Sequence, residues 1–226
     1  MLVVRGAVKD YDWGIVDGLA SWSGVATGGP QAELWFGVHP GGPSPLVDHT
    51  GTPTGEHLAD HFDIEHIPIL VKLLAAARPL SVQVHPTTAM AQRLWQAQQD
   101  GSGPAVLTDP FEKSEMLIAL GPFEALAGWR DPAGAQAILA GLPGCADAVA
   151  ELSAGDVKGA IVALLAVADV STAVARLPEA AAAAGLVGAE QHAYATIAQM
   201  YPSDAGALVT ALLSFVELSE GEAVYV

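Results

Sequence analysis

The sequence predicts a protein of mixed β and α structure, in which a mostly antiparallel β-sandwich or incomplete jelly roll carries a helical subdomain. Residues 1–130 are rich in Gly, Pro, His and Trp and contain short runs typical of strands. Residues 131–213 are rich in alanine and follow a helical pattern. Residues 214–226 alternate like strands again. We therefore expect three parts along the chain.

The strands and helices of the first part are separated by turn-forming residues. Two helices are expected, one over residues 54–62 with Thr54 as its cap and one over residues 87–99. The second should end before a run of Asp, Gly, Ser and Pro at residues 100–104. Five β-prone runs are expected to form strands, over residues 33–38, 69–74, 80–85, 115–120 and 123–129.

Helix signals recur through the alanine-rich part, which we expect to form four to six short helices. Asp131 and Pro132 have the residue types of an N-cap and a first helical position, and Gly141 is a stop signal. Asp156 is suited to cap a helix that runs through residues 161–165. Further helices are expected over residues 171–177, 189–200 and 203–213.

The tail changes pattern once more. Residues 215–218 alternate like a strand, residues 219–222 have the composition of a turn, and residues 223–226 are typical of the next strand. The sequence therefore stops in the middle of a predicted strand. Because an unpaired β-prone edge favours association, we expect this chain to pair with itself or with a missing C-terminal half.

The composition excludes several classes of protein. With 25 Asp and Glu against 9 Lys and Arg, the net charge of −16 repels nucleic acid and anionic membranes. The apolar runs are far shorter than the roughly 20 residues of a spanning helix, and the start lacks the pattern of a signal peptide. A single cysteine, Cys145, excludes an intrachain disulfide and a cysteine metal cage. We therefore expect a cytoplasmic protein that binds neither nucleic acid nor membrane.

Polar side chains share one face of two predicted strands. Ser81, Gln83 and His85 alternate with valines, and Lys113 and Glu115 repeat the spacing on a second strand. An amide oxygen, an imidazole and a carboxylate brought together would form a first coordination shell for a divalent metal, with an ammonium beside it. The same residues also fit a hydrogen-bonded structural histidine and a surface ion pair.

A series of motifs runs in order across the first 130 residues. They are Tyr-Asp-Trp-Gly at 11–14, Ala-Glu-Leu-Trp-Phe-Gly-Val-His-Pro at 32–40 with Pro-Ser at 43–44, Leu-Val-Lys at 70–72, Pro-Leu-Ser-Val-Gln-Val-His-Pro at 79–86, Lys-Ser-Glu-Met at 113–116 and Phe-Glu-Ala-Leu-Ala-Gly-Trp-Arg at 123–130. In these motifs the chain resembles the N-terminal half of type I phosphomannose isomerase (mannose-6-phosphate isomerase). The alanine-rich part is similar to that family's inserted helical domain, and the tail to the return strands of its barrel.

The resemblance implies a zinc-dependent cupin that interconverts mannose 6-phosphate and fructose 6-phosphate through an enediol-type proton transfer. It implies a catalytic cupin-like domain over residues 1–130, a helical domain over 131–213 and return strands over 214–226. It further implies that Gln83, His85 and Glu115 bind the zinc ion. Lys113 is then the catalytic residue, as an electrophile or in proton transfer. The remaining implied contacts to the hexose 6-phosphate are Lys72, Ser81 and Trp13.

The chain also departs from the family pattern. Phe111 and Glu112 stand where the family commonly has Asn-His, and Thr87 and Thr88 stand where it commonly has Asp-Lys. In the family, a further His ligand and a substrate-binding Arg follow the strand that corresponds to residues 223–226. We therefore expect a truncated member that holds zinc with three of four protein ligands and has impaired activity. The alternatives are a non-catalytic cupin that binds a sugar phosphate, an inactive fragment, and a helical interaction protein built on residues 131–213.

Overall fold

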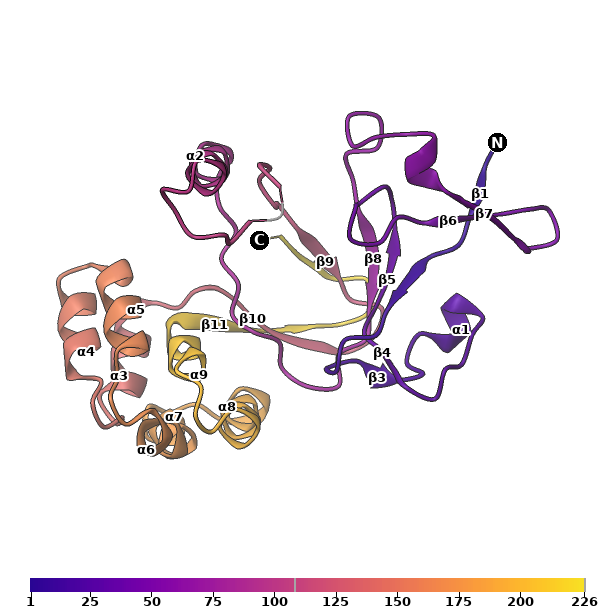
Figure 1. Cartoon of the computed structure of the whole chain (residues 1–226). Coiled ribbons are helices and arrows are strands. Elements are labelled where there is room, and N and C mark those ends of the chain that lie inside the picture. The colour runs from indigo at the N-terminus through magenta and orange to yellow at the C-terminus, as the bar shows by residue number, and fades with distance from the viewer. Residues whose placement is uncertain (108, 226) are drawn as a thin grey trace. The chain divides into compact units, whose positions relative to one another are not determined.

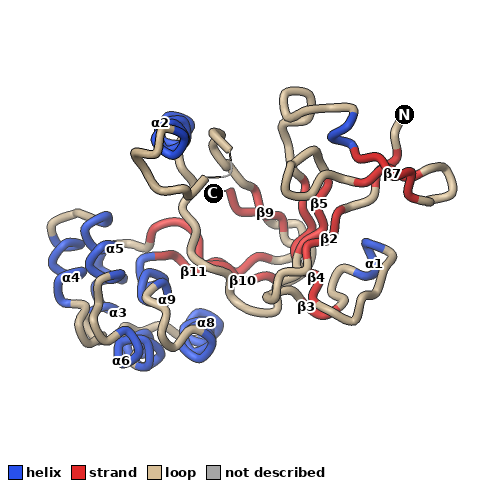
Figure 2. The backbone as a smooth tube through the Cα atoms, in the orientation of Figure 1, coloured by secondary structure: helices blue, strands red, loops and turns tan. Residues whose placement is uncertain are grey.

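The structure, a computed structural model, describes residues 1–107 and 109–225. The chain divides into two compact units, residues 1–80 and residues 81–226, and their elements can be followed in Figures 1 and 2. Every strand pair among the described residues is antiparallel. The expected class, a mixed β and α protein with antiparallel sheets, is therefore confirmed.

The first unit is built mainly from short strands. They form the three-stranded sheets β2–β5–β8 and β1–β6–β7 and the pair β3–β4. The elements are β1 (Val3–Val4), β2 (Ala7–Lys9), β3 (Ile15–Val16), α1 (Ala20–Ser23), β4 (Pro30–Gln31), β5 (Glu33–Phe36), β6 (Pro45–Val47), β7 (Pro53–His57), the 3-10 helix η1 (Leu58–Asp60) and β8 (Val71–Leu74). The strands expected at 33–38 and 69–74 are thus present as β5 and β8.

The prediction of a helix over residues 54–62 is wrong, because this segment contains the strand β7 followed by η1. β7 pairs antiparallel with β6, and the hydroxyl of Thr54 donates to the carbonyl of Leu46 on β6 instead of capping a helix. Gly55 lies inside β7 with a φ of +88°, outside the α-helical region. Pairing across the sheet therefore overrode the local capping signal.

The second unit combines two antiparallel strand pairs, β10–β11 and β9–β12, with helices. Figure 1 shows α3 to α9 gathered at one end of the β10–β11 pair and α2 apart from them. The elements are α2 (Thr88–Gln99), β9 (Met116–Ile118), β10 (Phe123–Trp129), α3 (Pro132–Leu139), α4 (Ala146–Ser153), α5 (Val157–Leu165), α6 (Val170–Ala175), α7 (Leu177–Ala183), α8 (Gly188–Met200), α9 (Gly206–Val209), the 3-10 helix η2 (Thr210–Leu212), β11 (Leu213–Leu218) and β12 (Ala223–Tyr225). Val226, the end of the last predicted strand, lies outside the described residues.

The alanine-rich part forms more helices than expected. Seven α-helices and η2 lie between β10 and β11, all within described residues. Asp131 caps α3 and Asp156 caps α5, each accepting a 2.8 Å hydrogen bond from the backbone N–H three residues on, as the sequence predicted. The helix expected at 171–177 divides into α6 and α7, because Pro178 lies in the first turn of α7. In the described part of the chain, no helix combines the length and apolarity needed to cross a bilayer.

One apolar core joins these helices, and Tyr194 and Leu164 are among its fully buried members. At its edge, Arg130 ties the strands to α8. Its guanidinium donates to the carbonyl of Leu213 (3.1 Å) and to the Tyr194 hydroxyl (3.2 Å), and it also pairs with Glu190. Burial lowers the pKa of Arg130, but the bond to Glu190 and the charges of Tyr194 and Glu190 outweigh it, so the net pKa is raised. Burial also raises the pKa of Tyr194.

Two expectations at the start of the second unit had different outcomes. α2 matches the helix predicted at 87–99, and the hydroxyl of Thr87 accepts from the backbone N–H of Met90 as an N-cap. The prediction of a strand over residues 80–85 is wrong, because these residues form an irregular segment. Val84 in this segment is 79% exposed. Alternation alone did not produce a strand here, since no described strand pairs with the segment.

Candidate functional site

The residues singled out from the sequence fall into two groups, one in each compact unit. The first unit holds Trp13 and Lys72, and the second holds Ser81, Gln83, His85, Lys113 and Glu115. Trp13 stacks on Tyr11, with ring centroids 5.7 Å apart and planes 25° from parallel. The aromatic motif at residues 11–14 therefore forms one stacked pair before β3.

In the first unit, charged and aromatic side chains share one face of the sheet β2–β5–β8. Glu33 and Trp35 are two residues apart on β5 and so leave the same face. Lys9 of β2 lies opposite Glu33, and Lys72 of β8 lies opposite Trp35. Leu34 points to the other face, where it is fully buried. The register thus gathers two lysines, a carboxylate and an indole on one face, while Leu34 is buried on the opposite face.

Glu33 is the centre of this group. Its side chain is only 9% exposed, and its Oε1 lies 3.6 Å from the Nζ of Lys72. Its Oε2 accepts a 2.8 Å hydrogen bond from the indole Nε1 of Trp35. A carboxylate this well buried is stabilised by such partners. Lys72 was predicted from the sequence and Glu33 was not, although the i, i+2 spacing of Glu33 and Trp35 on a strand was an available signal.

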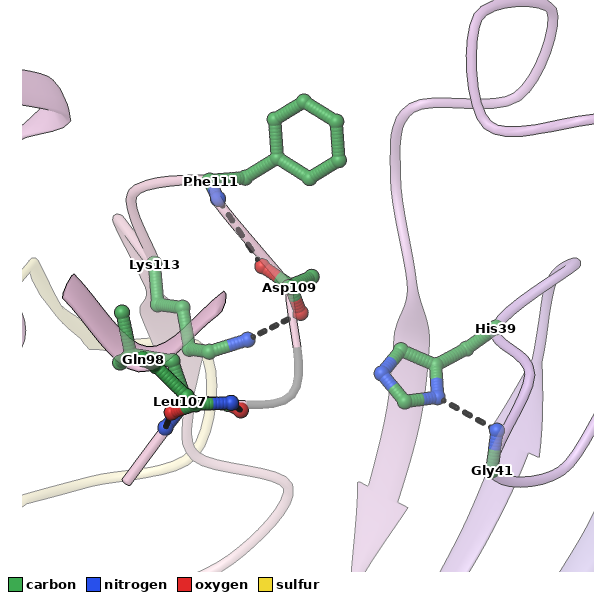
Figure 3. Close-up of polar contacts among 7 residues, drawn as sticks. All are labelled: His39, Gly41, Gln98, Leu107, Asp109, Phe111 and Lys113. Carbon is green, nitrogen blue, oxygen red and sulfur yellow. Dashed lines mark hydrogen bonds and ion pairs between the residues drawn. The ribbon is translucent and has the colours of Figure 1, made fainter. Parts of the chain in front are cut away.

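The second lysine of this face holds the loop after β5. Lys9 Nζ lies 4.8 Å from the centroid of the Trp35 ring and donates to the carbonyl of Gly41 at 2.7 Å. His39 packs edge-on against Trp35, with centroids 5.0 Å apart. Its Nδ1 accepts a 3.0 Å hydrogen bond from the N–H of Gly41 (Figure 3). The His-Pro-Gly-Gly run is therefore clamped onto the same indole that contacts Glu33.

In the second unit, His85 and Glu115 are brought together from segments about thirty residues apart. His85 precedes α2 and Glu115 directly precedes β9. The Nε2 of His85 lies 3.8 Å from the Oε2 of Glu115. Nitrogen and oxygen ligands about 2.1 Å from a tetrahedral zinc ion are about 3.4 Å from each other. An imidazole and a carboxylate at this separation therefore fit two positions of a zinc site.

Gln83 and Ser81 are exposed on the irregular segment that precedes His85. The three side chains do not leave one face of a strand, because the strand at 80–85 is not formed. Throughout residues 1–107 and 109–225, no three His, Cys, Asp or Glu side chains gather closely enough to hold a metal. His85 and Glu115 are thus the two expected ligands that the structure brings together, and the role of Gln83 stays a prediction.

An open cavity of about 450 Å³ adjoins His85. The hydroxyl of Thr88 donates to the carboxylate of Glu112 within its lining. Thr87, Thr88 and Glu112, which belong to two of the departures from the family pattern, therefore all line this cavity. Hydroxyls and a carboxylate are groups that hydrogen-bond sugar hydroxyls. The full lining is His85, Pro86, Thr87, Thr88, Ala89, Glu112, Ser114 and Tyr225.

Lys113 forms an ion pair with Asp109, a residue that was not predicted from the sequence. Its Nζ donates to the Oδ2 of Asp109 at 2.8 Å, and the Oδ1 of Asp109 accepts from the N–H of Phe111 at 3.0 Å (Figure 3). The Lys113 side chain is 36% exposed and that of Asp109 is 22% exposed, so the ion pair is partly shielded from water. The Asp-Pro pair at 109–110 was the sequence signal for this turn.

The chain is similar in sequence to a family of known proteins. The family model described as phosphomannose isomerase type I, catalytic domain, matches residues 1–132. The mannose-6-phosphate isomerase of Salmonella typhimurium is 28% identical over 245 residues, which cover 97% of this chain and 62% of the relative. Mannose-6-phosphate isomerase 1 of Arabidopsis thaliana is 27% identical over 265 residues, covering 98% of this chain and 60% of the relative. The chain therefore spans about three fifths of the length of these relatives.

Solved structures give the same result for the fold. A lysine-to-alanine mutant of phosphomannose isomerase from Salmonella typhimurium matches with a TM-score of 0.80 and 28% identity, over 100% of this chain and 62% of that chain. A mannose 6-phosphate isomerase bound with zinc and yttrium matches with a TM-score of 0.77 and 28% identity, over 100% of this chain and 63% of that chain. The expected cupin-type fold is thereby confirmed.

Proposed function

This chain belongs to the type I phosphomannose isomerase family, and from that premise we propose that it forms the zinc-binding catalytic part of an isomerase acting on mannose 6-phosphate. The observation that carries the proposal is the pair of His85 and Glu115, 3.8 Å apart beside a cavity lined by hydroxyls. The zinc-bound relative of the same fold supports zinc as the metal.

His85, Glu115 and Gln83 would hold the zinc ion. The imidazole and the carboxylate already lie at a suitable separation, and the amide oxygen of Gln83 is two residues from His85. When bound, the ion would stabilise negative charge on the oxygens attached to C1 and C2 of the sugar. Removal of either His85 or Glu115 therefore removes a ligand and also part of the electrostatic support for the reaction.

The proposed reaction transfers a proton between two carbons of the open-chain sugar. C2 of mannose 6-phosphate loses its proton while the C1 carbonyl oxygen gains one, giving an enediol. C1 then gains a proton and the C2 hydroxyl loses one, giving fructose 6-phosphate, so no atom is added or lost. The ammonium of Lys113 would stabilise the oxyanion that develops on the way to the enediol.

The substrate is an anion, and this chain carries a net charge of −16. A hexose 6-phosphate therefore needs a local cationic site. We assign this role in the first unit to Lys72, whose side chain is 30% exposed beside Glu33 and so remains accessible. Trp13 and Ser81 are the further proposed substrate contacts, through the indole face and the hydroxyl.

We also assign residues 131–213 as a helical insertion within one cupin domain made of residues 1–130 and 214–226. Its support is the pairing of β10 with β11, since these strands flank all the helices from α3 to α9. An insertion between two paired strands leaves the ends of the inserted segment side by side, as a compact helical domain requires.

The test is a coupled assay that follows fructose 6-phosphate formation from mannose 6-phosphate by residues 1–226, with zinc supplied. Turnover that disappears in Glu115→Ala and persists in Glu179→Ala, a surface change on α7, is the expected result. Zinc-loaded chain that turns over no mannose 6-phosphate would refute the catalytic proposal for this chain. The exposure of Gln83 favours one second candidate, a non-catalytic sugar-phosphate-binding module. Calorimetry that detects binding of mannose 6-phosphate without turnover would support that candidate.

A further inference from the structure

Between α2 and β9, side-chain contacts hold two described stretches, residues 106–107 and residues 109–113. Gln98 lies near the end of α2. Its Oε1 accepts hydrogen bonds from the backbone N–H groups of Val106 at 2.8 Å and Leu107 at 3.0 Å. Its Nε2 donates to the carbonyl of Leu107 at 2.9 Å (Figure 3). One amide side chain therefore satisfies three backbone groups and ties residues 106–107 to the helix.

A second group of contacts joins Asp109 to Phe111 and Lys113. One carboxylate oxygen is fixed by the N–H of Phe111, and the other accepts from the Lys113 ammonium at 2.8 Å. The carboxylate is therefore held by the backbone on one side while it holds the lysine on the other. The lysine chain has four rotatable carbon–carbon bonds and would otherwise sample many conformers.

We infer that Asp109 is a positioning residue, which holds the Lys113 ammonium in one orientation two residues ahead of Glu115. This inference rests on the proposed function, because Lys113 is the group that would stabilise the developing oxyanion. An ammonium displaced by about 1 Å loses much of its effect on a transition state, on the order of a hundredfold in rate. Asp109 would thus act through Lys113 and not by touching the sugar.

A double-mutant cycle on the whole chain tests this role. In the isomerase assay, Asp109→Ala is expected to lower kcat by about tenfold to a hundredfold with little change in KM, and Asp109→Glu should restore part of the loss. Adding Asp109→Ala to Lys113→Ala should lower kcat no further. Glu179→Ala, which breaks the exposed pair of Arg176 and Glu179, is the matched control and should leave kcat unchanged. Losses that multiply in the double mutant would overturn the inference.

Lysine labelling separates failure of this inference from failure of the proposed function. The chain has four lysines, so acetylation at each can be followed by mass spectrometry, with the exposed Lys158 as internal reference. A lysine held by a carboxylate must leave it before its nitrogen can react. Asp109→Ala should therefore raise the labelling rate of Lys113 relative to Lys158 by roughly two- to fivefold. An unchanged ratio of Lys113 to Lys158 labelling would overturn the positioning role of Asp109, whether or not the chain turns over sugar. A raised labelling ratio without turnover would support the contact between Asp109 and Lys113 and refute only the catalytic proposal.

Discussion

The substitution Glu33→Gln removes the charge at the centre of the polar face of the sheet β2–β5–β8 while keeping the shape of the side chain. The amide oxygen can still accept from the indole of Trp35, so the 2.8 Å contact is retained in weaker form. The attraction to Lys72, whose Nζ lies 3.6 Å away, is lost. At an effective dielectric constant of about 20 that attraction amounts to about 4.6 kcal/mol.

Desolvation of a carboxylate that is only 9% exposed offsets much of this attraction. Conversion of a charged hydrogen bond to a neutral one removes about a further 1 kcal/mol. We therefore expect Glu33→Gln to lower the free energy of unfolding by about 1–3 kcal/mol. Urea unfolding followed by tryptophan fluorescence measures this value, because Trp35 donates directly to the altered side chain.

The matched control is Glu56→Gln in the same unit. Glu56 pairs with His61 at 3.0 Å, but its side chain is 60% exposed, so its loss should change the free energy of unfolding by less than about 0.5 kcal/mol. Equal effects of the two substitutions would refute the argument that burial makes Glu33 the more important carboxylate.

The remaining predictions concern the second unit. Glu190→Ala removes the carboxylate partner of Arg130 and should lower the free energy of unfolding by about 1–3 kcal/mol, measured by far-UV circular dichroism; a change below about 0.5 kcal/mol would contradict the role of Arg130 as a tie between strands and α8. Burial raises the pKa of the Cys145 thiol above its usual 9.0, so its contribution to stability is present below about pH 9 and is lost as the pH rises through the folded pKa. Between about pH 8 and 10, the free energy of unfolding of Cys145→Ala should therefore fall less than that of the wild type. Urea unfolding at several pH values measures this difference. An equal fall in both proteins would exclude this thiol as a source of alkaline instability.

The sequence predicted those elements whose signals are local. Asp131 and Asp156 cap helices because an N-cap depends on the next three residues alone. β10 coincides with its predicted bounds at 123–129, since its alternation is supported by pairing with β11.

The wrong or missing predictions concern residues whose structure depends on contacts outside their own segment. Residues 54–62 carry a capping signal, but pairing with β6 makes them β7 and η1. Residues 80–85 alternate like a strand yet pair with no described strand. Asp109 was missed because its role depends on a turn that returns its carboxylate to Lys113, and no periodicity reports such a contact. The sequence therefore did not predict the irregular backbone of residues 80–85 or the contact between Asp109 and Lys113.

Zinc content tests the central claim most directly. Chain dialysed against zinc and then freed of excess metal is expected to retain about one zinc ion per molecule. His85→Ala and Glu115→Ala should each abolish most of this binding, while His192→Ala on α8, outside the candidate site, should retain it. Zinc retained equally by all four proteins would contradict the claim that His85 and Glu115 form a metal site.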